Sequence, residues 1–210
     1  MSTPLIWTNA SLEPKRKFRY VVRFSGDNTD AEMANSLKNF TFLAQTCDRP
    51  GVKLGATEHK YFNKTYYHPG RVTWEPNPLT MKLVDIQSTT TQKTDTNQTL
   101  LKAFVKSGLQ VFKADGDFRT VGKDRAINAL GSVKIQVLSS LTDSTRLVDG
   151  DAFLASGDGI VETWELKNAW LESFKPDALD YGAEDLLTVT VAIRYDWCTL
   201  ETNQLGKLLD

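Results

Sequence analysis

Few residues in this chain have the types and spacing that catalysis requires. The two histidines, His59 and His68, are nine residues apart in a segment rich in β-favouring residues. They therefore lie either far apart along one arm or opposite each other across it. No serine or cysteine in a nucleophile setting stands near them in the sequence, so a surface role is favoured over catalysis.

Metal binding also finds little support in the sequence. Cys47 and Cys198 sit in separate apolar-alternating segments without a companion at ligand spacing, which favours buried thiols over a disulfide framework or a metal site. The acidic pairs at 115–117 and 149–151 do not continue into the ligand spacing of a calcium loop and are typical of turns. We therefore expect no metal and no cofactor.

Acid–base and phosphate chemistry are equally weakly indicated. The glycine-containing segment 156–160 lacks the Lys-Ser/Thr of a phosphate-binding loop. Glu162, Glu165 and Glu172 could form an acid–base pair, yet any alternating strand presents such carboxylates to solvent. The sequence thus predicts no catalytic residues, and the chain is not expected to be an enzyme.

Amino-acid composition limits the classes of protein to which this chain can belong. The 210 residues fit one large or two small domains, and a hydrophobic fraction of 40% is enough for a sizeable core. With 25 Lys+Arg against 26 Asp+Glu, the chain lacks the cationic excess of a nucleic-acid reader. No run of eighteen apolar residues and no secretory signal is found, so we expect synthesis in the cytoplasm and no membrane association.

Alternation of apolar and polar residues predicts a series of strands, at 17–24, 40–47, 79–86, 132–138, 160–172 and 187–197. The first strand is expected to bury Phe18, Tyr20, Val22 and Phe24. The last is expected to bury a single face composed of Leu187, Val189, Val191, Ile193, Tyr195 and Trp197.

One helix is predicted. Its apolar stripe comprises Leu100, Leu101, Phe104, Val105 and Leu109, and Asp95 or Asn97 can cap its start. Segments 87–99, 113–131 and 142–159 are predicted as surface loops. The fold class is mainly β (α+β), an antiparallel β-barrel or sandwich with one flanking helix. We expect an extended N-terminal arm at 1–15, a single β-barrel domain at 16–200 and a C-terminal tail at 201–210.

Residues 52–74 predict a long extended hairpin, with a turn at Asn63-Lys64 and a second turn at 68–70. The hairpin carries four large aromatics, Tyr61, Phe62, Tyr66 and Tyr67. These are too many for two strands exposed to water. The hairpin is therefore expected either to fold over its own domain or to lie on a neighbouring subunit.

The order of these segments, over residues 15–200, resembles the tail tube proteins of long-tailed bacteriophages, particularly those with contractile tails. The resemblance rests on three pieces: Phe62-Asn-Lys-Thr-Tyr66 with the Val-Thr-Trp and Leu-Thr-Met-Lys-Leu strands that follow it, Trp164-Glu-Leu-Lys-Asn-Ala-Trp-Leu171, and the closing Leu187-Thr-Val-Thr-Val-Ala-Ile-Arg-Tyr-Asp-Trp197. The sequence departs from the family pattern in the insertion at 142–159 and in the long N-terminal arm.

The resemblance implies a structural virion protein, a subunit of homohexameric rings stacked into the hollow tail tube. It further implies that the hairpin aromatics Tyr61, Phe62, Tyr66 and Tyr67 contact the next ring. The implied partners are copies of the chain, a tail sheath outside, baseplate proteins, and the tape-measure protein and DNA in the lumen. The tail would be assembled in the cytoplasm of the bacterial host and would deliver DNA. The alternatives are a baseplate tube initiator or a type VI secretion tube protein, and, from a different class, a ligand-binding β-barrel or enzyme.

Overall fold

The computed structural model describes residues 14–25, 34, 36–37, 40, 43–87, 95–107, 122–139, 160–182, 184–202 and 206–207. Its elements are β1 (Tyr20–Phe24), β2 (Ala44–Cys47), β3 (Gly51–Tyr61), β4 (Lys64–Glu75), β5 (Leu79–Val84), α2 (Thr96–Lys106), α3 (Lys123–Leu130), β6 (Val133–Leu138), β7 (Ile160–Lys167), β8 (Trp170–Pro176), β9 (Thr188–Arg194), β10 (Trp197–Thr202) and β11 (Gly206–Lys207).

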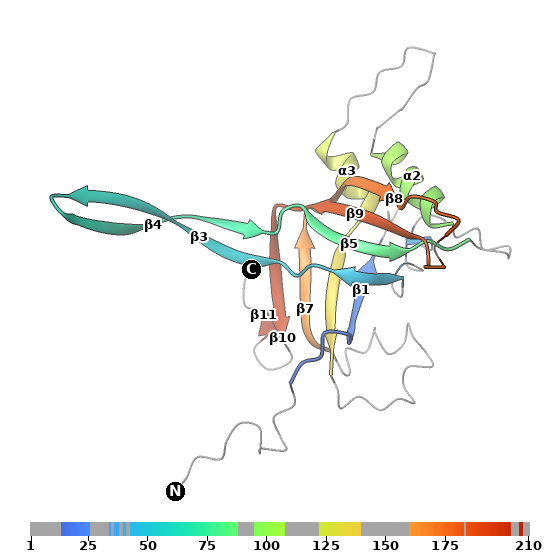
Figure 1. Ribbon diagram of the computed structural model, residues 1–210, viewed down its shortest axis with the longest axis horizontal. Coiled ribbons are helices and arrows are strands. Elements are labelled where there is room, and N and C mark those ends of the chain that lie inside the picture. The colour runs from blue at the N-terminus through green and yellow to red at the C-terminus, as the bar shows by residue number, and fades with distance from the viewer. Residues whose placement is uncertain are drawn as a thin grey trace, which may run out of the picture.

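The strands form three antiparallel groups. A five-stranded sheet has the order β1-β6-β7-β10-β11, a four-stranded sheet has the order β2-β5-β9-β8, and β3 pairs with β4 alone (Figure 1). Both larger sheets contribute to one apolar core, for example through Val22 and Ile135 of the first and Met81 and Val191 of the second. The predicted mainly β fold with a long hairpin is confirmed, as two open sheets that share a core.

Two of the predicted strands bend from one sheet into the other. Residues 160–172 are divided between β7 and β8, with Asn168 at a positive φ of 54° where the chain turns. Residues 187–197 divide between β9 and β10 in the same way. The two bends lie together, because Asn168 Nδ2 donates to Asp196 Oδ2 at 2.7 Å and the Asp196 amide donates to the Lys167 carbonyl at 3.1 Å.

Three side chains that were predicted to be buried are exposed, because they lie at strand ends or at a bend. Val189, Val191, Ile193 and Tyr195 are buried as predicted, but Leu187 is 44% exposed because it precedes β9, and Trp197 is 45% exposed. After the bend the alternation restarts, so Cys198 takes the buried position of β10 in place of Trp197. Phe18 is likewise exposed, because β1 begins only at Tyr20.

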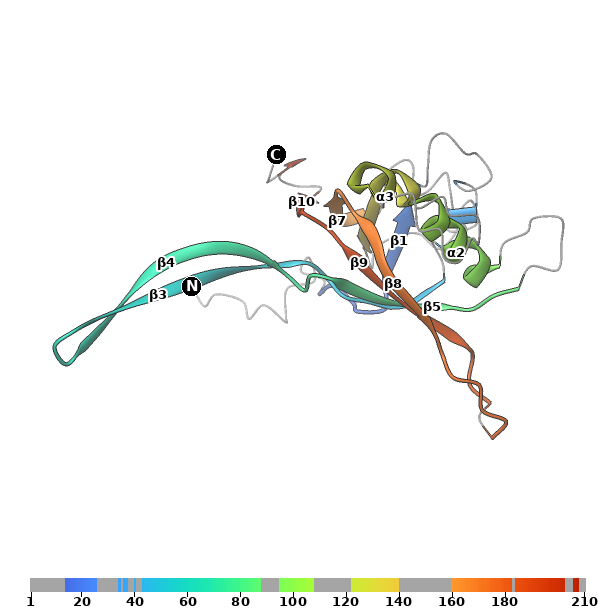
Figure 2. The same cartoon turned by 90° about the horizontal axis from the view of Figure 1, so that it is seen from above.

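The described residues contain two helices, where one was predicted. α2 begins at Thr96, so the predicted loop at 87–99 is wrong for its last four residues, and the Asp95 carboxylate caps the helix through the Gln98 amide at 2.9 Å. α3 lies within the predicted loop 113–131 and buries Ala126, Ala129 and Leu130. Both helices pack near β8 (Figure 2). The ring of Phe104 in α2 contacts that of Phe174 in β8, with centroids 5.5 Å apart.

Part of the predicted apolar stripe on α2 is wrong, because Leu101 and Val105 are exposed while Leu100 and Ala103 face the core. The predicted loop at 142–159, the acidic pairs at 115–117 and 149–151, and Leu109 lie outside the described residues. No helix in the described ranges is both long and apolar enough to span a membrane.

Candidate assembly interface

The β3–β4 hairpin extends away from the two sheets in both views (Figures 1 and 2). Its turn lies at Phe62 and Asn63, next to the predicted position, with Phe62 at a positive φ of 51°. The second predicted turn, at 68–70, is wrong: these residues continue β4, and the register shifts between Leu54 and Ala56 instead. A strand of eleven residues, at about 3.3 Å each, is about 36 Å long.

The two strands approach closely at the register shift. A Cβ on Gly70 would lie 3.1 Å from the Gly55 carbonyl oxygen, so the backbone of the opposite strand would have to shift by a few tenths of an ångström to admit a side chain. Glycine at this position therefore allows the hairpin to continue through the irregularity as one long ribbon.

The pairing register shows which hairpin side chains share a face. His59 lies opposite Tyr66 and His68 lies opposite Thr57, so these four residues share one face, while Tyr67 lies opposite Glu58 on the other. The His59 and His68 rings are 6.4 Å apart between centroids. The histidines are thus diagonal neighbours across the two strands, on one face of the hairpin, and do not lie far apart along it.

All four predicted aromatics are exposed on the hairpin tip. Phe62 is 88% exposed, and its ring packs only edge-on against Tyr61, with centroids 4.6 Å apart. Tyr66 and Tyr67 point to opposite faces and are exposed as well. The hairpin therefore does not fold over its own domain. An isolated two-stranded hairpin is only marginally stable in water. Exposed aromatic side chains grouped at its tip are typical of a surface that another molecule covers.

The root of the hairpin is held firmly to the body. Trp74 packs against the core. The Tyr195 hydroxyl donates to the Pro76 carbonyl at 3.0 Å, and Asn77 Nδ2 donates to the Tyr195 carbonyl at 2.8 Å. Burial, with a smaller contribution from Cys198, raises the pKa of Tyr195 to about 12, so this phenol keeps the proton that it donates. The hairpin is thereby fixed in direction relative to the sheets.

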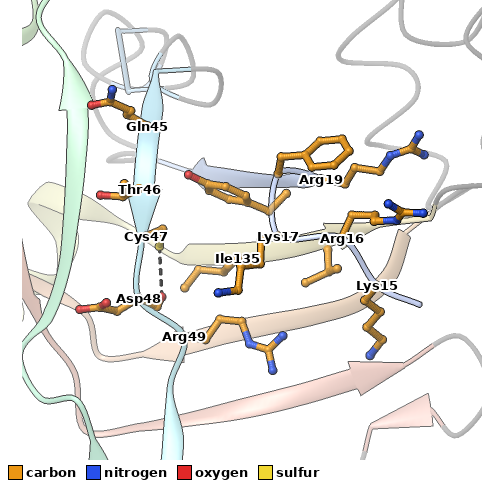
Figure 3. Close-up of a pocket in the computed structure, with 13 residues that line it drawn as sticks. Lys15, Arg16, Lys17, Arg19, Gln45, Thr46, Cys47, Asp48, Arg49 and Ile135 are labelled. Atoms are coloured by element: carbon orange, nitrogen blue, oxygen red, sulfur yellow. Dashed lines mark hydrogen bonds between the residues drawn. The ribbon is translucent and has the colours of Figure 1, made fainter. Parts of the chain in front are cut away.

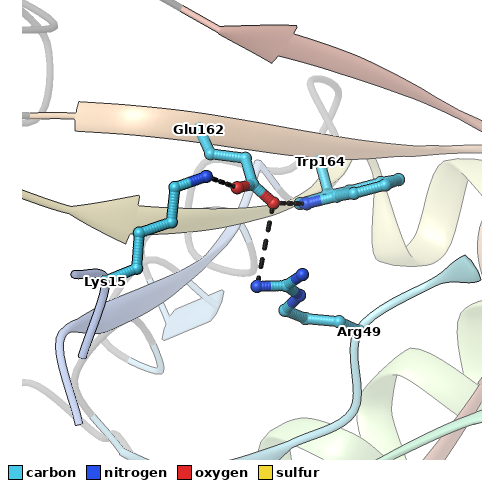
Figure 4. A network of polar contacts seen from close by, with 4 residues as sticks. All are labelled: Lys15, Arg49, Glu162 and Trp164. Carbon is cyan, nitrogen blue, oxygen red and sulfur yellow. Dashed lines mark hydrogen bonds and ion pairs between the residues drawn. The ribbon is translucent and has the colours of Figure 1, made fainter. Parts of the chain in front are cut away.

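The buried carboxylate of Glu162 in β7 forms an ionic contact with two exposed cations beside the hairpin root (Figure 4). Lys15 and the Trp164 indole donate to its carboxylate, and Arg49 Nη1 lies 3.9 Å from Oε1. Burial raises the pKa of Glu162, but the hydrogen bonds and the two cationic charges outweigh burial and lower it overall. The Glu162 carboxylate therefore connects two segments to the first sheet: the segment before β1, through Lys15, and the connection between β2 and β3, through Arg49.

Sequence reasoning missed this role of Glu162. The carboxylate was expected on the solvent face, yet it shares the buried alternation of β7 with Ile160 and Leu166. That period-two spacing from Ile160 was the signal that could have located it.

A groove of about 670 Å³ adjoins this contact (Figure 3). One wall is the segment before β1, the other is β2 with its following connection, and Ile135 and Val137 contribute apolar surface. Five cations line it against the single acid Asp48; they are Lys15, Arg16, Lys17, Arg19 and Arg49. The groove is therefore strongly cationic and partly apolar.

The comparisons with known proteins agree on the fold. No family model and no curated protein matches the sequence. Among solved structures, one chain of the anti-feeding prophage baseplate is similar with a TM-score of 0.54 at 16% identity, over 92% of this chain and 99% of that one. A chain of the sheath/tube terminator of the PVC extracellular contractile injection system gives 0.52 at 12% identity, over 90% and 98%. The chain has a tail tube-like fold.

A chain of the PVC sheath–tube complex supports the same assignment, with a TM-score of 0.50 at 14% identity over 96% of this chain and 99% of that one. The alignment spans nearly the whole of both chains, so the similarity is one of the overall fold.

The remaining sequence candidates are dispersed in this tail tube-like fold. Glu172 forms a bidentate pair with Arg194 at 2.7 and 2.9 Å, and Glu165 pairs with Lys167 at 2.9 Å, so neither forms an acid–base pair with Glu162. No metal-binding cluster occurs within the described ranges.

Both cysteines are free thiols. Burial, joined for Cys47 by the charge of Asp48, raises the pKa of Cys47 and of Cys198 to about 12. At neutral pH they are protonated, which fits packing rather than nucleophilic chemistry.

Proposed function

We propose that this chain is a non-enzymatic structural subunit that assembles as homohexameric rings stacked into a hollow tail tube. The observation that carries the proposal is the β3–β4 hairpin, which extends from the body and exposes aromatic side chains on its tip. In this proposal Tyr61, Phe62, Tyr66 and Tyr67 form the contact with the next ring.

Open sheet edges support assembly within a ring. The first sheet ends at β1 and β11, and the second ends at β2 and β8, so strands of neighbouring subunits can pair with them. Exposed strand edges otherwise tend to aggregate, and closure into a ring removes them. The chain therefore suits a subunit whose main partners are copies of itself.

The similarity to chains of contractile injection structures supports a particle-associated protein with a sheath outside the tube. We place it in the tail of a virion assembled in the cytoplasm of a bacterial host, attached to baseplate proteins. The tape-measure protein and DNA would pass through its lumen. The nearly balanced charge of the chain suits this passage, because a strongly cationic lumen would retain phosphate.

A baseplate tube initiator is a second candidate, favoured by the similarity to a baseplate chain. A type VI secretion tube protein would use the same architecture. The initiator differs in one measurable respect, since it would form a ring that does not extend into a filament of identical rings.

The experiment replaces Phe62 and Tyr66 together with serine. Aromatic residues at the centre of an interface contribute about 2 kcal/mol or more each when truncated, so filaments should fail to grow. Both side chains are exposed in the single subunit, so its thermal melt should not change. Negative-stain electron microscopy reads out the filaments, and calorimetry reads out the melt.

The matched control is Leu101→Ser with Val105→Ser on α2, because these exposed apolar residues lie away from the hairpin. Control filaments should be normal. If the hairpin variant forms filaments as well as the control, the ring contact lies elsewhere. If the hairpin variant unfolds the subunit, the aromatics belong to its own core and the stacking role is wrong.

A further inference from the structure

The connection between β8 and β9 carries both acidic and apolar side chains, and they are exposed. It extends beyond the sheets as a projecting loop (Figure 2). Its acids are Asp177, Asp180, Glu184 and Asp185, and its exposed apolar side chains are Leu179, Tyr181 and Leu186. We refer to residues 177–182 and 184–187 as the acidic loop.

The acids of this loop have no cationic partner in the part of the chain that the structure describes. Asp177 accepts a hydrogen bond from the Thr188 hydroxyl, and Asp180 accepts one from the Gly182 amide at 2.9 Å. None of the four acids forms an ion pair with a described residue. A loop with this charge and with large exposed apolar groups is typical of a surface that another molecule covers.

The cationic groove has the complementary character. Glu162 compensates Lys15 and Arg49, but Lys17 and Arg19 face no carboxylate among the described residues. Arg19 donates to a neutral acceptor, the Ser139 carbonyl, at 2.9 Å. Exposed Phe18 adds apolar surface at the same place. The groove thus offers cations and apolar contact where the acidic loop offers carboxylates and apolar side chains.

We propose that the cationic groove of one subunit binds the acidic loop of a second copy of this chain. The inference rests on the proposed self-assembly and adds a contact distinct from the hairpin. Groove and loop are different surfaces of one molecule, so the contact is head-to-tail. A head-to-tail contact gives a closed ring when the rotation between subunits divides a full turn, and an open helix when it does not. In this proposal the groove–loop contact joins subunits within a ring, whereas the hairpin joins successive rings.

The test uses charge reversal in the full chain. The groove variant carries Lys17→Glu and Arg19→Glu, and the loop variant carries Glu184→Lys and Asp185→Lys. The groove variant leaves three lining cations against three lining acids, and the loop variant leaves two acids beside two lysines. Each variant alone therefore loses the net attraction between groove and loop, and rings should be lost in analytical ultracentrifugation. In an equal mixture, the unchanged groove of the loop variant can bind the unchanged loop of the groove variant, and the introduced lysines lie opposite the introduced glutamates, so alternation of the two variants should restore the ring. Raising the salt to about 1 M should weaken both the wild-type and the restored rings, because the Debye length falls to about 3 Å.

The matched control carries Lys102→Glu and Arg125→Glu, which reverse two exposed cations on the helices. It changes the net charge of the chain by the same amount as the groove variant. It should form rings as the wild type does. Should the groove variant fail to fold, Lys17→Glu alone replaces it. Rings formed by either charge-reversed variant by itself, or a mixture that stays monomeric, would overturn the groove–loop contact.

A peptide probe separates this inference from the proposed function. A fluorescently labelled peptide of residues 175–188 should bind the wild-type chain and bind the groove variant at least about tenfold more weakly, as expected for loss of paired charges. If the wild type forms no rings but the peptide binds in this way, the tube function fails and the groove–loop recognition stands. If rings form and the peptide binds both proteins equally, the recognition is wrong and the tube function stands.

Discussion

Replacement of Val191 by aspartate tests whether the two sheets share the core described above. Val191 is 1% exposed in the middle of β9, opposite Met81 of β5 on one side and Phe174 of β8 on the other. Losing the buried valine costs about 1.5–3 kcal/mol. A buried carboxylate without a partner adds several kcal/mol more. The total approaches the whole stability of a domain, about 5–15 kcal/mol, so the variant should be largely unfolded or insoluble.

The neighbouring residue supplies a matched control. Thr190 lies on the opposite face of β9, with Lys82 and Lys175 as its cross-strand partners. Thr190→Asp adds the same charge between two cations and should change the free energy of unfolding by about 0.5 kcal/mol or less. Urea denaturation followed by tryptophan fluorescence measures the free energy of unfolding of both variants. If the aspartate variant cannot be purified, Val191→Ala replaces it and should lower the free energy of unfolding by about 2 kcal/mol.

The pH dependence strengthens the test. A buried carboxyl has a raised pKa, so the penalty of Val191→Asp relative to the wild type should be largest at neutral pH and should shrink as the pH falls toward the unfolded value of about 3.9. A Val191→Asp variant as stable as Thr190→Asp would refute the assigned faces of β9 and the shared core.

Two further predictions concern buried titratable groups. Glu162→Gln should lower the free energy of unfolding by about 1 kcal/mol at pH 7, because Lys15 and Arg49, which are both about half exposed, lose a counter-charge that water partly screens. Since folding lowers the pKa of Glu162, this difference should vanish as the pH falls through that lowered pKa, and a difference constant with pH would contradict the ionic contact. Cys198 is buried with a pKa of about 12, so it should react with iodoacetamide at pH 8 at least about a hundredfold more slowly in the folded than in the unfolded chain; equal rates would refute its burial. Cys47 is half-buried at the groove, so its reaction should be slowed mainly through its raised pKa of about 12.

The sequence was most informative where period-two alternation runs uninterrupted. The cores of β5, β6 and β9 follow from it directly, since one buried face and one polar face leave a single register. Alternation does not reveal where a strand leaves its sheet. Asn168 and Asp196 are residue types that favour turns, but each stands alone within an otherwise alternating run, so β7–β8 and β9–β10 were each predicted as one strand.

The helix α3 was missed for a different reason. Three of its eight residues are charged, and it buries two alanines and one leucine, which give a weak apolar stripe. Tertiary packing near β8 stabilises it. The candidate interface could be predicted in part. The hairpin and its aromatics follow from composition and turn residues, whereas the cationic groove joins segments more than a hundred residues apart, such as Lys17 and Val137, and needs the fold.

Electron microscopy of the purified wild-type chain at high concentration tests the central claim most directly. We predict hollow filaments of stacked rings with sixfold symmetry, in which the β3–β4 hairpin of each subunit contacts the next ring. A chain that stays monomeric at all concentrations would contradict the proposed tube function and would favour a ligand-binding β-barrel instead.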